Sequence, residues 1–267
     1  MKTKFLCLVF LSSAICPLLH AQTVISDEEI LKLYQGLRVA DVCDAMDMAG
    51  LRDVGVMDQR IEALWRDLDD FSHIICGVAV TARYVPTNRI VKNPMTKEEF
   101  MKMESEWYNS ITTEPFVDHL REGSVIVLDV QGDGDVGSVG SFNALFWKSK
   151  GARGVVSNGG IRDTDEIIKE KIPVYSDHLE RGRGIRPGRN EIESFNKPVT
   201  LGGVLVRPGD VVVADGDGVI VVPREQAAVV AQYAREILEK DKQGRLNLYK
   251  TLGMPPDKTV EMEKKDK

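Results

Sequence analysis

An alternation of apolar and amphipathic segments between residues 125 and 170 constrains the fold of this chain more than any other feature. The apolar runs 125–130 and 154–157 predict strands, and the segments 142–150 and 165–170 predict helices. Strands that alternate with helices in this way are typical of crossover units, in which consecutive strands pair in parallel. The sequence therefore predicts an α/β fold around a parallel sheet.

Segments on both sides extend this alternation. Ser26 and Glu29 form a capping box that predicts a helix toward Gln35, and apolar spacing predicts a second helix over 39–50. The expected order is two helices, the α/β section and a β-rich section closed by a helix. The remaining strands are predicted at 74–82, 199–206, 211–214 and 219–222, and the closing helix at 224–240.

Residues 86–110 interrupt this order and are interpreted as an insertion. They begin with Pro and Asn residues and contain an amphipathic helix that Thr96 and Glu99 cap. Trp107 and Tyr108 stand near the end of that helix. They either shape a pocket for a larger substrate or pack the helix against the domain.

The two ends of the chain are predicted to lie outside the folded domain, which spans residues 22–250. Residues 1–21 combine a basic start with an apolar run and a small residue, Ala21, as secretory signal peptides do. We therefore expect cleavage near Ala21 and a periplasmic or secreted protein. Residues 251–267 are too charged and too poor in apolar residues to pack firmly, and predict a polar C-terminal tail.

Composition excludes several classes of protein. Two of the 35 Lys and Arg residues and none of the 41 Asp and Glu residues lie in 1–21, so the remainder carries a formal charge of −8. Such an acidic chain is not expected to bind nucleic acid, and no stretch reaches the roughly 20 apolar residues of a membrane span. Cys43 and Cys76 stand in apolar surroundings, as buried thiols or as a disulfide. The cysteine and histidine spacing does not favour a zinc site.

Two glycine-rich acidic stretches resemble nucleotide or calcium loops. Residues 132–137 match Gly-x-Gly-x-x-Gly, but Asp133 and Asp135 would place two carboxylates beside a pyrophosphate. Neither this stretch nor residues 215–218 has a glutamate at the twelfth position of a calcium loop. We interpret residues 215–218 as a tight turn whose carboxylates accept hydrogen bonds from backbone amides.

Two motifs at the ends of predicted strands carry the candidate chemistry. Arg162 and Asp163 follow two glycines after the strand 154–157, and together can bind an anionic substrate and a divalent metal. The alternative is an exposed ion pair worth under about 1 kcal/mol. The turn 137–141 opens the next helix, so its amides favour a small anionic ligand, unless Ser141 simply caps that helix.

Residues 140–143 together with 154–163 resemble the RraA-like family. The resemblance implies a swivelling β/β/α domain with flanking N- and C-terminal helices. It also implies a homotrimer or homohexamer with sites between subunits. Further similarities cover residues 28–240 in the family's order, at 41–47, 196–199, 202–203, 208–210 and 215–219.

The catalytic members of this family are divalent-metal-dependent aldolases that cleave 4-hydroxy-4-methyl-2-oxoglutarate and decarboxylate oxaloacetate. The resemblance implies a lyase that uses Mg²⁺ or Mn²⁺ on a small-molecule oxo acid, through a pyruvate enolate. Asp163 matches the metal ligand and Arg162 the catalytic, substrate-binding arginine. Glu236 or Glu239 is a candidate carboxylate from a neighbouring subunit. The loop that holds the substrate carboxylate matches Gly140, Ser141, Phe142 and Asn143.

Two residues depart from the aldolases of the family. Ser141 and Asn158 stand where acidic residues are usual, and the loss of two carboxylates is expected to weaken metal binding. The signal peptide does not suit an enzyme of central metabolism either. Two alternatives follow. One is a non-catalytic binding or scaffold protein, and the other is a periplasmic sugar-acid lyase or isomerase that uses the same metal site.

Overall fold

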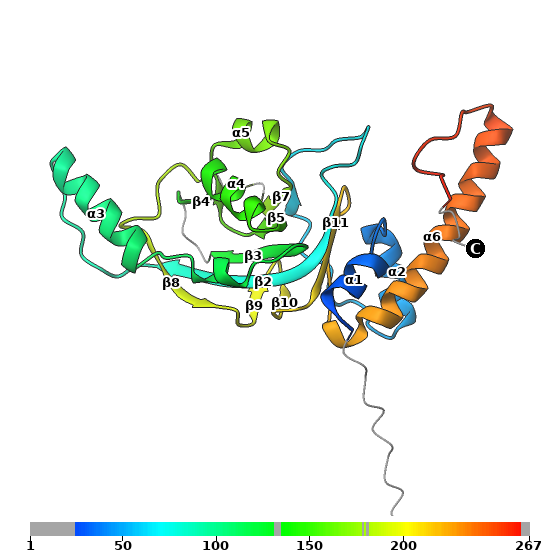
Figure 1. Ribbon diagram of the computed structural model, residues 1–267, viewed down its shortest axis with the longest axis horizontal. Coiled ribbons are helices and arrows are strands. Elements are labelled where there is room, and N and C mark those ends of the chain that lie inside the picture. The colour runs from blue at the N-terminus through cyan, green and yellow to red at the C-terminus, as the bar shows by residue number, and fades with distance from the viewer. Residues whose placement is uncertain (1–24, 131–134, 178, 180–181, 263–267) are drawn as a thin grey trace, which may run out of the picture.

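The computed structural model describes residues 25–130, 135–177, 179 and 182–262. These residues form an elongated molecule with one curved sheet along its middle (Figure 1). The predicted signal peptide lies outside the described residues, as do Gly132, Asp133 and Gly134 of the glycine-rich loop.

The middle of the sheet is parallel, as the β/α alternation predicts. β2 pairs with β3, β3 with β5 and β5 with β7, all in parallel. Antiparallel strands extend it, with β1 on β7, β11 and β12 beyond β2, and β8 along the end of β2. The bounds are β1 Ile61–Ala63, β2 Ile75–Pro86, β3 Ser124–Val130, β5 Ala152–Ser157, β7 Val174–Asp177, β8 Asn190–Phe195, β11 Val211–Asp215 and β12 Gly218–Val222.

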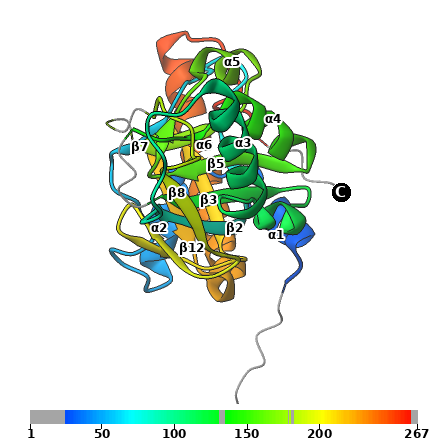
Figure 2. The same ribbon diagram turned by 90° about the vertical axis from the view of Figure 1, so that its left-hand side faces the viewer.

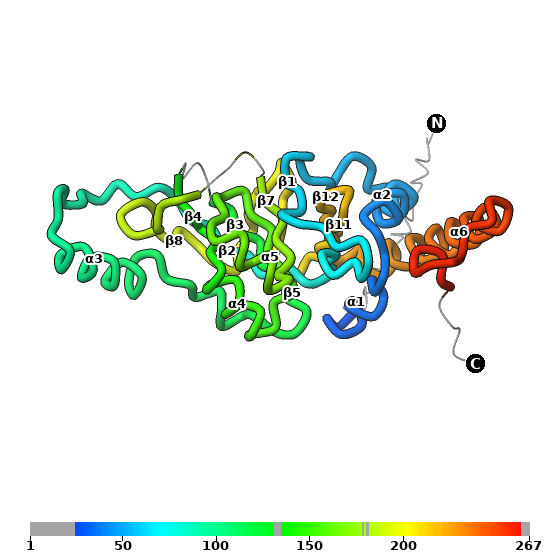
Figure 3. Tube along the Cα trace, turned by 90° about the horizontal axis from the view of Figure 1, so that it is seen from above, coloured from blue at the N-terminus to red at the C-terminus, as the bar shows by residue number. Residues whose placement is uncertain are grey.

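Helices cover the sheet in two groups. The crossover helices α4 (Ser141–Ser149) and α5 (Thr164–Lys169) lie together on one face of its parallel part. At one end, α1 (Asp27–Leu33), α2 (Val39–Met48) and α6 (Ala227–Leu252) pack together, α6 following the 3₁₀ turn η2 (Arg224–Gln226). Seen from above, α6 extends beyond the sheet at the end opposite α3 (Lys97–Ser110; Figure 3).

Burial on both faces explains why β3 is a continuous apolar run. Every residue of β3 is buried, and successive side chains point to opposite faces. Ile126 and Leu128 pack with Trp147 of α4, whereas Val125 and Val127 pack with Leu201. Leu201 belongs to the hairpin of β9 (Val199–Leu201) and β10 (Val204–Val206). Each fully buried side chain of this size stabilises the fold by about 1.5–3 kcal/mol.

Local hydrogen bonds confirm the predicted caps. Capping boxes open α1 at Ser26 and α3 at Thr96, because both side chains and the glutamates three residues later bond reciprocally to the backbone. The turn between β11 and β12 is also confirmed. Asp215 accepts hydrogen bonds from the backbone amides of Asp217 and Val39, both at 2.8 Å. Asp215 therefore links this turn to the start of α2.

The C-terminal tail differs from its prediction. The last helix continues to Leu252 instead of ending near residue 240. Val260 is only 1% exposed, and Thr259 accepts a 3.0 Å hydrogen bond from Arg245. The prediction that the tail does not pack firmly is therefore wrong for this part. One apolar residue and one arginine of α6 anchor a segment whose average composition is polar.

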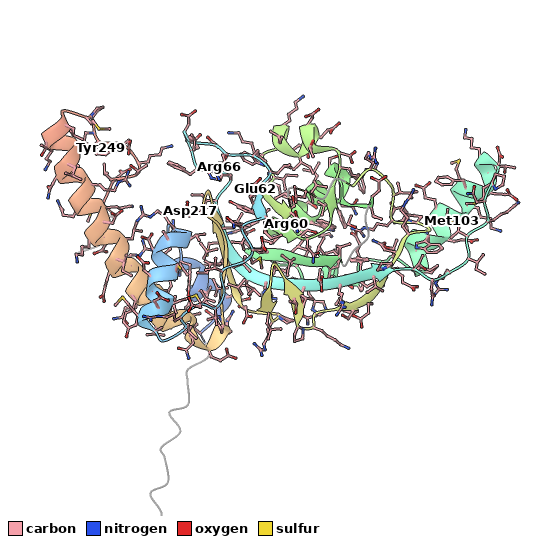
Figure 4. All side chains as sticks on the ribbon, turned by 180° about the vertical axis from the view of Figure 1, so that it is seen from behind. Arg60, Glu62, Arg66, Met103, Asp217 and Tyr249 are labelled. Atoms are coloured by element: carbon pink, nitrogen blue, oxygen red, sulfur yellow. The ribbon has the colours of Figure 1, made fainter. Side chains whose placement is uncertain are left out.

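The insertion projects from the domain as an arm. Figure 2 looks along the long axis with α3 toward the viewer, and Figure 4 places Met103 of α3 and Tyr249 of α6 at opposite ends of the molecule. Trp107 is buried, and its indole nitrogen donates to the carbonyl of Asn190 at 2.8 Å. The end of α3 is thus packed against the domain, while Tyr108 beside it stays 39% exposed.

Cys43 and Cys76 are both free thiols, so the two described cysteines form no disulfide. Burial raises the pKa of the Cys76 thiol to about 12, which keeps this group protonated. In the described part of the chain, no helix has the length and apolar character to cross a membrane.

Candidate active site

Three backbone segments meet at the ends of the parallel strands. The short strand β4 (Gly137–Val139) pairs in parallel with β6 (Gly160–Ile161), and Gly182 lies against both. A Cβ atom at Gly160 would lie 2.4 Å from Gly182 Cα, and one at Gly182 would lie 2.1 Å from the carbonyl oxygen of Val136. Only glycine permits this approach, so the glycines decide where the following side chains stand.

The predicted turn at residues 137–141 is therefore partly a strand. Val139 accepts a 2.9 Å hydrogen bond from the backbone amide of Arg162, which fixes the strand-end motif beside the start of α4. The sequence showed a glycine-rich connection here, but its pairing with β6 depends on a segment more than 20 residues later.

Arg162 and Asp163 stand side by side at this junction. The aliphatic part of Arg162 lies over Gly137, where an added Cβ would be 2.4 Å from Arg162 Cδ. Asp163 has a left-handed backbone, with φ of 55°, and is the N-cap residue of α5. Their side chains are 35% and 36% exposed, and Arg162 Nε lies 3.4 Å from Asp163 Oδ1. This long contact leaves both groups able to bind a ligand.

The start of α4 faces Asp163. The backbone amide of Ser141 donates to Asp163 Oδ2 at 3.3 Å, and an added Cβ at Gly140 would lie 2.9 Å from the same oxygen. Gly140 is the N-cap residue and has no side chain to cap the helix, so the first amide of α4 donates to Asp163 instead. The alternative in which Ser141 caps α4 is thus wrong, because Ser141 is already the first helical residue. The structure brings Gly140 and Ser141 to the predicted metal ligand.

Phe142 and Asn143 have different positions. The Phe142 side chain is 81% exposed on the surface of α4. Asn143 points to the side of the helix, where its Nδ2 donates to Glu114 Oε1 at 2.7 Å. The side chains of these two residues are thus not brought to Asp163, and only their backbone amides belong to the start of α4.

Glu114 and Arg186 form a buried network that the sequence did not reveal. Arg186 is 3% exposed, and its Nη1 donates to Glu114 Oε1 at 2.8 Å. Its guanidinium lies over the ring of Tyr84, 4.7 Å from the centroid, and donates to the carbonyl of Ser138 in β4. Trp147 donates to the second oxygen of Glu114 at 2.9 Å. This network holds β4 and α4 together behind the site.

Asn158 has a structural role that explains its departure from the family pattern. Its Oδ1 accepts from the amide of Val130 at 2.6 Å, and its Nδ2 donates to Asp129 Oδ1 at 2.9 Å. Asp129 is fully buried. An aspartate at 158 would place a second carboxylate against it, so an amide is the better partner here.

A shallow opening of about 410 Å³ lies in front of the arginine and aspartate. Arg183 was not predicted, since a single arginine in a polar loop carries no distinguishing signal. It donates to Asp135, and this hydrogen bond holds the pKa of the Asp135 carboxyl below its usual value. The lining residues are Ile161, Arg162, Asp163, Thr164, Gly182 and Arg183.

The carboxylates predicted on the last helix are distant in this chain. Glu236 and Glu239 belong to α6, which packs with α1 and α2 at one end of the sheet, away from α4 and α5 over its parallel part (Figure 1). Their contribution from a neighbouring subunit stays a prediction. Within the described ranges, no group of three or more His, Cys, Asp or Glu side chains could hold a metal ion. Asp163 is thus the carboxylate that the opening itself offers.

Comparisons with known proteins show which family and which relatives this chain is similar to. Residues 39–221 match the family model RraA-like, described as Aldolase/RraA. An uncharacterized protein of Methanocaldococcus jannaschii is 34% identical over 146 residues, which cover 53% of this chain and 65% of that protein. A putative 4-hydroxy-4-methyl-2-oxoglutarate aldolase of Halalkalibacterium halodurans is 36% identical over 115 residues, which cover 43% and 53%. The chain thus spans less than two thirds of either relative.

A solved structure confirms the predicted fold class. RraAS2 of Streptomyces coelicolor, described as an unusual member of an RNase ES inhibitor family, superposes with a TM-score of 0.63 at 22% identity. The alignment covers 84% of this chain and all of that one. At this identity the similarity concerns the fold alone.

Proposed function

Because the chain belongs to the RraA-like family, we propose that it is a divalent-metal-dependent lyase that cleaves a carbon–carbon bond of a 2-oxo acid. The observation that carries the proposal is the arrangement of Arg162 and Asp163. Both line one opening and both are about one third exposed. In the part of the chain that the structure describes, the ion pair they form is their own long contact of 3.4 Å. The relatives named as aldolases support the reaction class.

The residues around Asp163 fit a divalent cation. Gly140 leaves space beside Asp163 Oδ2 that a Cβ would fill, and the carboxylate is oriented by the amide of Ser141. Magnesium prefers oxygen ligands and retains several waters, so one carboxylate is a sufficient protein contact. Bound there, Mg²⁺ or Mn²⁺ would act as a Lewis acid on the oxygens of the oxo acid. Asp163 would hold it, and Ser141 would keep Asp163 oriented.

Arg162 would stabilise the charge that develops during cleavage. When the bond breaks, its electron pair moves toward the keto group and forms an enolate, whose oxygen becomes negative. The terminal nitrogens of Arg162 donate to no atom of the described residues, so they are available to this oxygen. A preorganised donor of this kind typically lowers the barrier by several kcal/mol, about 2.7–4 where one donor was removed.

The start of α4 would bind the carboxylate of the oxo acid. The first amides of a helix lack intrahelical partners and favour an anion. Arg186 and Glu114 fix this segment from behind, through Ser138 and Asn143. The loop of residues 140–143 therefore contributes backbone geometry, whereas Arg162 contributes the charge.

The test is pyruvate release from 4-hydroxy-4-methyl-2-oxoglutarate and from oxaloacetate, measured with and without Mg²⁺ or Mn²⁺. Asp163→Asn is expected to lower the rate about 100-fold or more, and Arg162→Lys about 100-fold. Asp165→Asn, which removes the same charge two residues later on α5, is expected to leave turnover within about twofold. Wild-type turnover in Asp163→Asn would refute the assignment.

The non-catalytic alternative gives a different result. Oxalate resembles a pyruvate enolate, so Mg²⁺ with oxalate is expected to raise the melting temperature of the protein, and of Asp165→Asn, but not of Asp163→Asn. A scaffold without a metal site would show no shift in any of the three. A sugar-acid lyase or isomerase would show the shift and no pyruvate release from either substrate.

Export and assembly are part of the proposal. We expect cleavage near Ala21 and a periplasmic or secreted protein, which N-terminal sequencing after cell fractionation checks. We also expect a homotrimer or homohexamer, because Glu236 and Glu239 can approach Asp163 only from another copy of the chain. Light scattering checks the mass, and a monomer would exclude their contribution.

A further inference from the structure

We propose that Asn158 and Gly159 form a self-modification site that the folded chain holds closed, so that a chain that unfolds is converted irreversibly at this position. The modification is deamidation, in which the side-chain amide of asparagine is lost as ammonia. These two residues are the one Asn-Gly pair in the sequence. The proposal does not depend on the proposed function, because it concerns the backbone that carries the candidate site.

The reaction uses the backbone nitrogen of Gly159 and the side chain of Asn158. This nitrogen gives up its proton and attacks Cγ of Asn158, so that a new C–N bond forms. The bond from Cγ to Nδ2 breaks, and the amide group takes up a proton and leaves as ammonia. Water then opens the resulting cyclic imide and leaves aspartate or isoaspartate. Glycine has no Cβ beside the attacking nitrogen, so ring closure meets the least steric hindrance there.

Packing explains why these two residues are adjacent. A Cβ atom at Gly159 would lie 2.7 Å from Cβ of Val130, so the end of β3 leaves room for glycine alone. Asn158 supplies an acceptor and a donor together. Its Oδ1 accepts from the amide of Val130 at 2.6 Å, and its Nδ2 donates to Asp129 Oδ1 at 2.9 Å. The tertiary structure therefore requires a pair of residues that is chemically labile in a free chain.

The same hydrogen bonds restrain both reacting groups. Ring closure brings Cγ of Asn158 within bonding distance of the next nitrogen, and a side chain tied at both amide atoms cannot move there without breaking both bonds. The amide of Gly159 donates to Ser157 Oγ at 3.0 Å, so its deprotonation breaks a third. Gly159 is also buried, and burial disfavours the charged form of its nitrogen. The folded chain thus closes the site.

The products do not fit the folded chain. Aspartate at 158 replaces the donor to the buried Asp129 with a second carboxylate. Isoaspartate lengthens the main chain by one carbon, which displaces the residues that follow. The backbone amide of Arg162 then loses its 2.9 Å hydrogen bond to the carbonyl of Val139. A modified chain therefore refolds into a less stable protein, and the modification is a permanent record of unfolding.

Peptide mass spectrometry of the full-length protein tests the proposal. The protein is incubated at mildly alkaline pH, folded in buffer and unfolded in guanidinium chloride. The tryptic peptide of residues 154–162, which contains one asparagine, is then followed. Modification of the folded protein is expected to be about 100-fold slower, or about 2.8 kcal/mol at about 1.4 kcal/mol per factor of ten. One charge-assisted and one neutral hydrogen bond account for a factor of this size.

A synthetic peptide of the same nine residues, incubated in buffer, is the control for the denaturant. It is expected to react as fast as the unfolded protein. Equal rates for the folded protein and the peptide would overturn the proposal, as would faster modification of the unfolded chain at another asparagine.

Ser157→Ala separates local restraint from global stability. The variant frees the amide of Gly159, so modification of the folded protein is expected to rise by about 2- to 10-fold, while the rate in guanidinium chloride stays unchanged. Ser149→Ala is the matched control. It removes a hydroxyl that donates to the carbonyl of Phe146 on α4, and is expected to leave both rates unchanged. All folded rates are measured well below the melting temperature, so that global unfolding does not contribute. An unchanged rate in folded Ser157→Ala would contradict the role of the Gly159 amide.

Refolding gives a second readout. Chains kept in guanidinium chloride until residue 158 is modified, and then refolded, are expected to melt at a lower temperature than chains unfolded only briefly. Equal melting temperatures would show that the modification does not record unfolding in the stability of the protein.

Discussion

The side-chain amide of Asn143 donates to Glu114 at 2.7 Å, which ties the first turn of α4 to the 3₁₀ helix η1 (Pro115–His119) that follows Glu114. The same carboxylate also receives Arg186 and Trp147. One half-buried acid therefore satisfies three donors from two other segments. The position of the candidate carboxylate-binding loop depends on it.

Removing this acid is expected to destabilise the protein. Glu114→Ala leaves the buried guanidinium of Arg186 without its carboxylate, so the free energy of unfolding should fall by about 3 kcal/mol or more. Urea denaturation measures it. Glu191→Ala is the control, because it breaks an ion pair with Arg89 that is partly exposed, and should cost under about 1 kcal/mol. Equal losses in the two variants would contradict the role of Glu114.

A methyl group at the glycine junction is expected to displace the site. Gly160→Ala would bring Cβ within 2.4 Å of Gly182, which must then move away together with Arg183. Oxalate binding in the presence of Mg²⁺ and the melting temperature should both decrease. Gly244→Ala is the control, since nothing lies within 4 Å of that position on α6 and alanine favours a helix by about 0.5–1 kcal/mol. Unchanged oxalate binding in Gly160→Ala would mean that the junction does not position the site.

Asn158→Asp is expected to lower stability at neutral pH. The change replaces the amide that donates to Asp129 at 2.9 Å with a second carboxylate, and an unmatched buried polar pair costs about 1–3 kcal/mol. The loss should diminish as the pH falls, because protonating one of the two acids restores a donor. Asn109→Asp on the exposed surface of α3 serves as the control. A family-like aspartate that stabilised the protein would contradict this explanation of Asn158.

Stability is expected to fall on the acid side of neutrality because of His73. This side chain is 3% exposed, and burial lowers its pKa below the usual 6.5, while its Nδ1 accepts a hydrogen bond from the amide of Asp67 at 3.1 Å. The unfolded chain binds a proton near pH 6.5, whereas the folded chain resists protonation until lower pH. The neutral form thus stabilises the fold above pH 6.5, and this contribution is lost as the pH falls toward the folded pKa.

The measurement is the unfolding free energy in urea between pH 7.5 and 5. The wild type should lose stability faster than His73→Asn, whose side-chain oxygen can still accept from Asp67. Parallel slopes in the two proteins would exclude His73 as the cause.

The helix starts could be predicted from sequence, because the hydrogen bonds that cap a helix join residues only three positions apart. Ser26 and Thr96 bond to residues three positions later, so the caps of α1 and α3 are visible in the sequence. β7 and β8 were not predicted. β7 has only four residues, and β8 has several polar side chains and only its first residue buried. Their strand character depends on pairing with β5 and β2.

The candidate site also contains residues that the sequence identified and residues whose role depends on contacts distant in sequence. Arg162 and Asp163 were identified because they are adjacent in sequence after two glycines. Ser141 and Asn158 appeared only as departures from a family pattern. Only the tertiary structure shows their partners. The backbone amide of Ser141 donates to Asp163, 22 residues later, and the side-chain amide of Asn158 donates to Asp129, 29 residues earlier.

The sequence alone determined the order of the longer helices and strands, the parallel pairing in the middle of the sheet and the adjacent cation and carboxylate, because periodicity, caps and neighbours along the chain act over a few residues. The tertiary structure decided which side chains share the opening. Gly137, Gly160 and Gly182 come from three connections, and their close contact brings Arg183 to the same opening as Arg162. That contact arises from the packing of the strands, so no local pattern in the chain could reveal it.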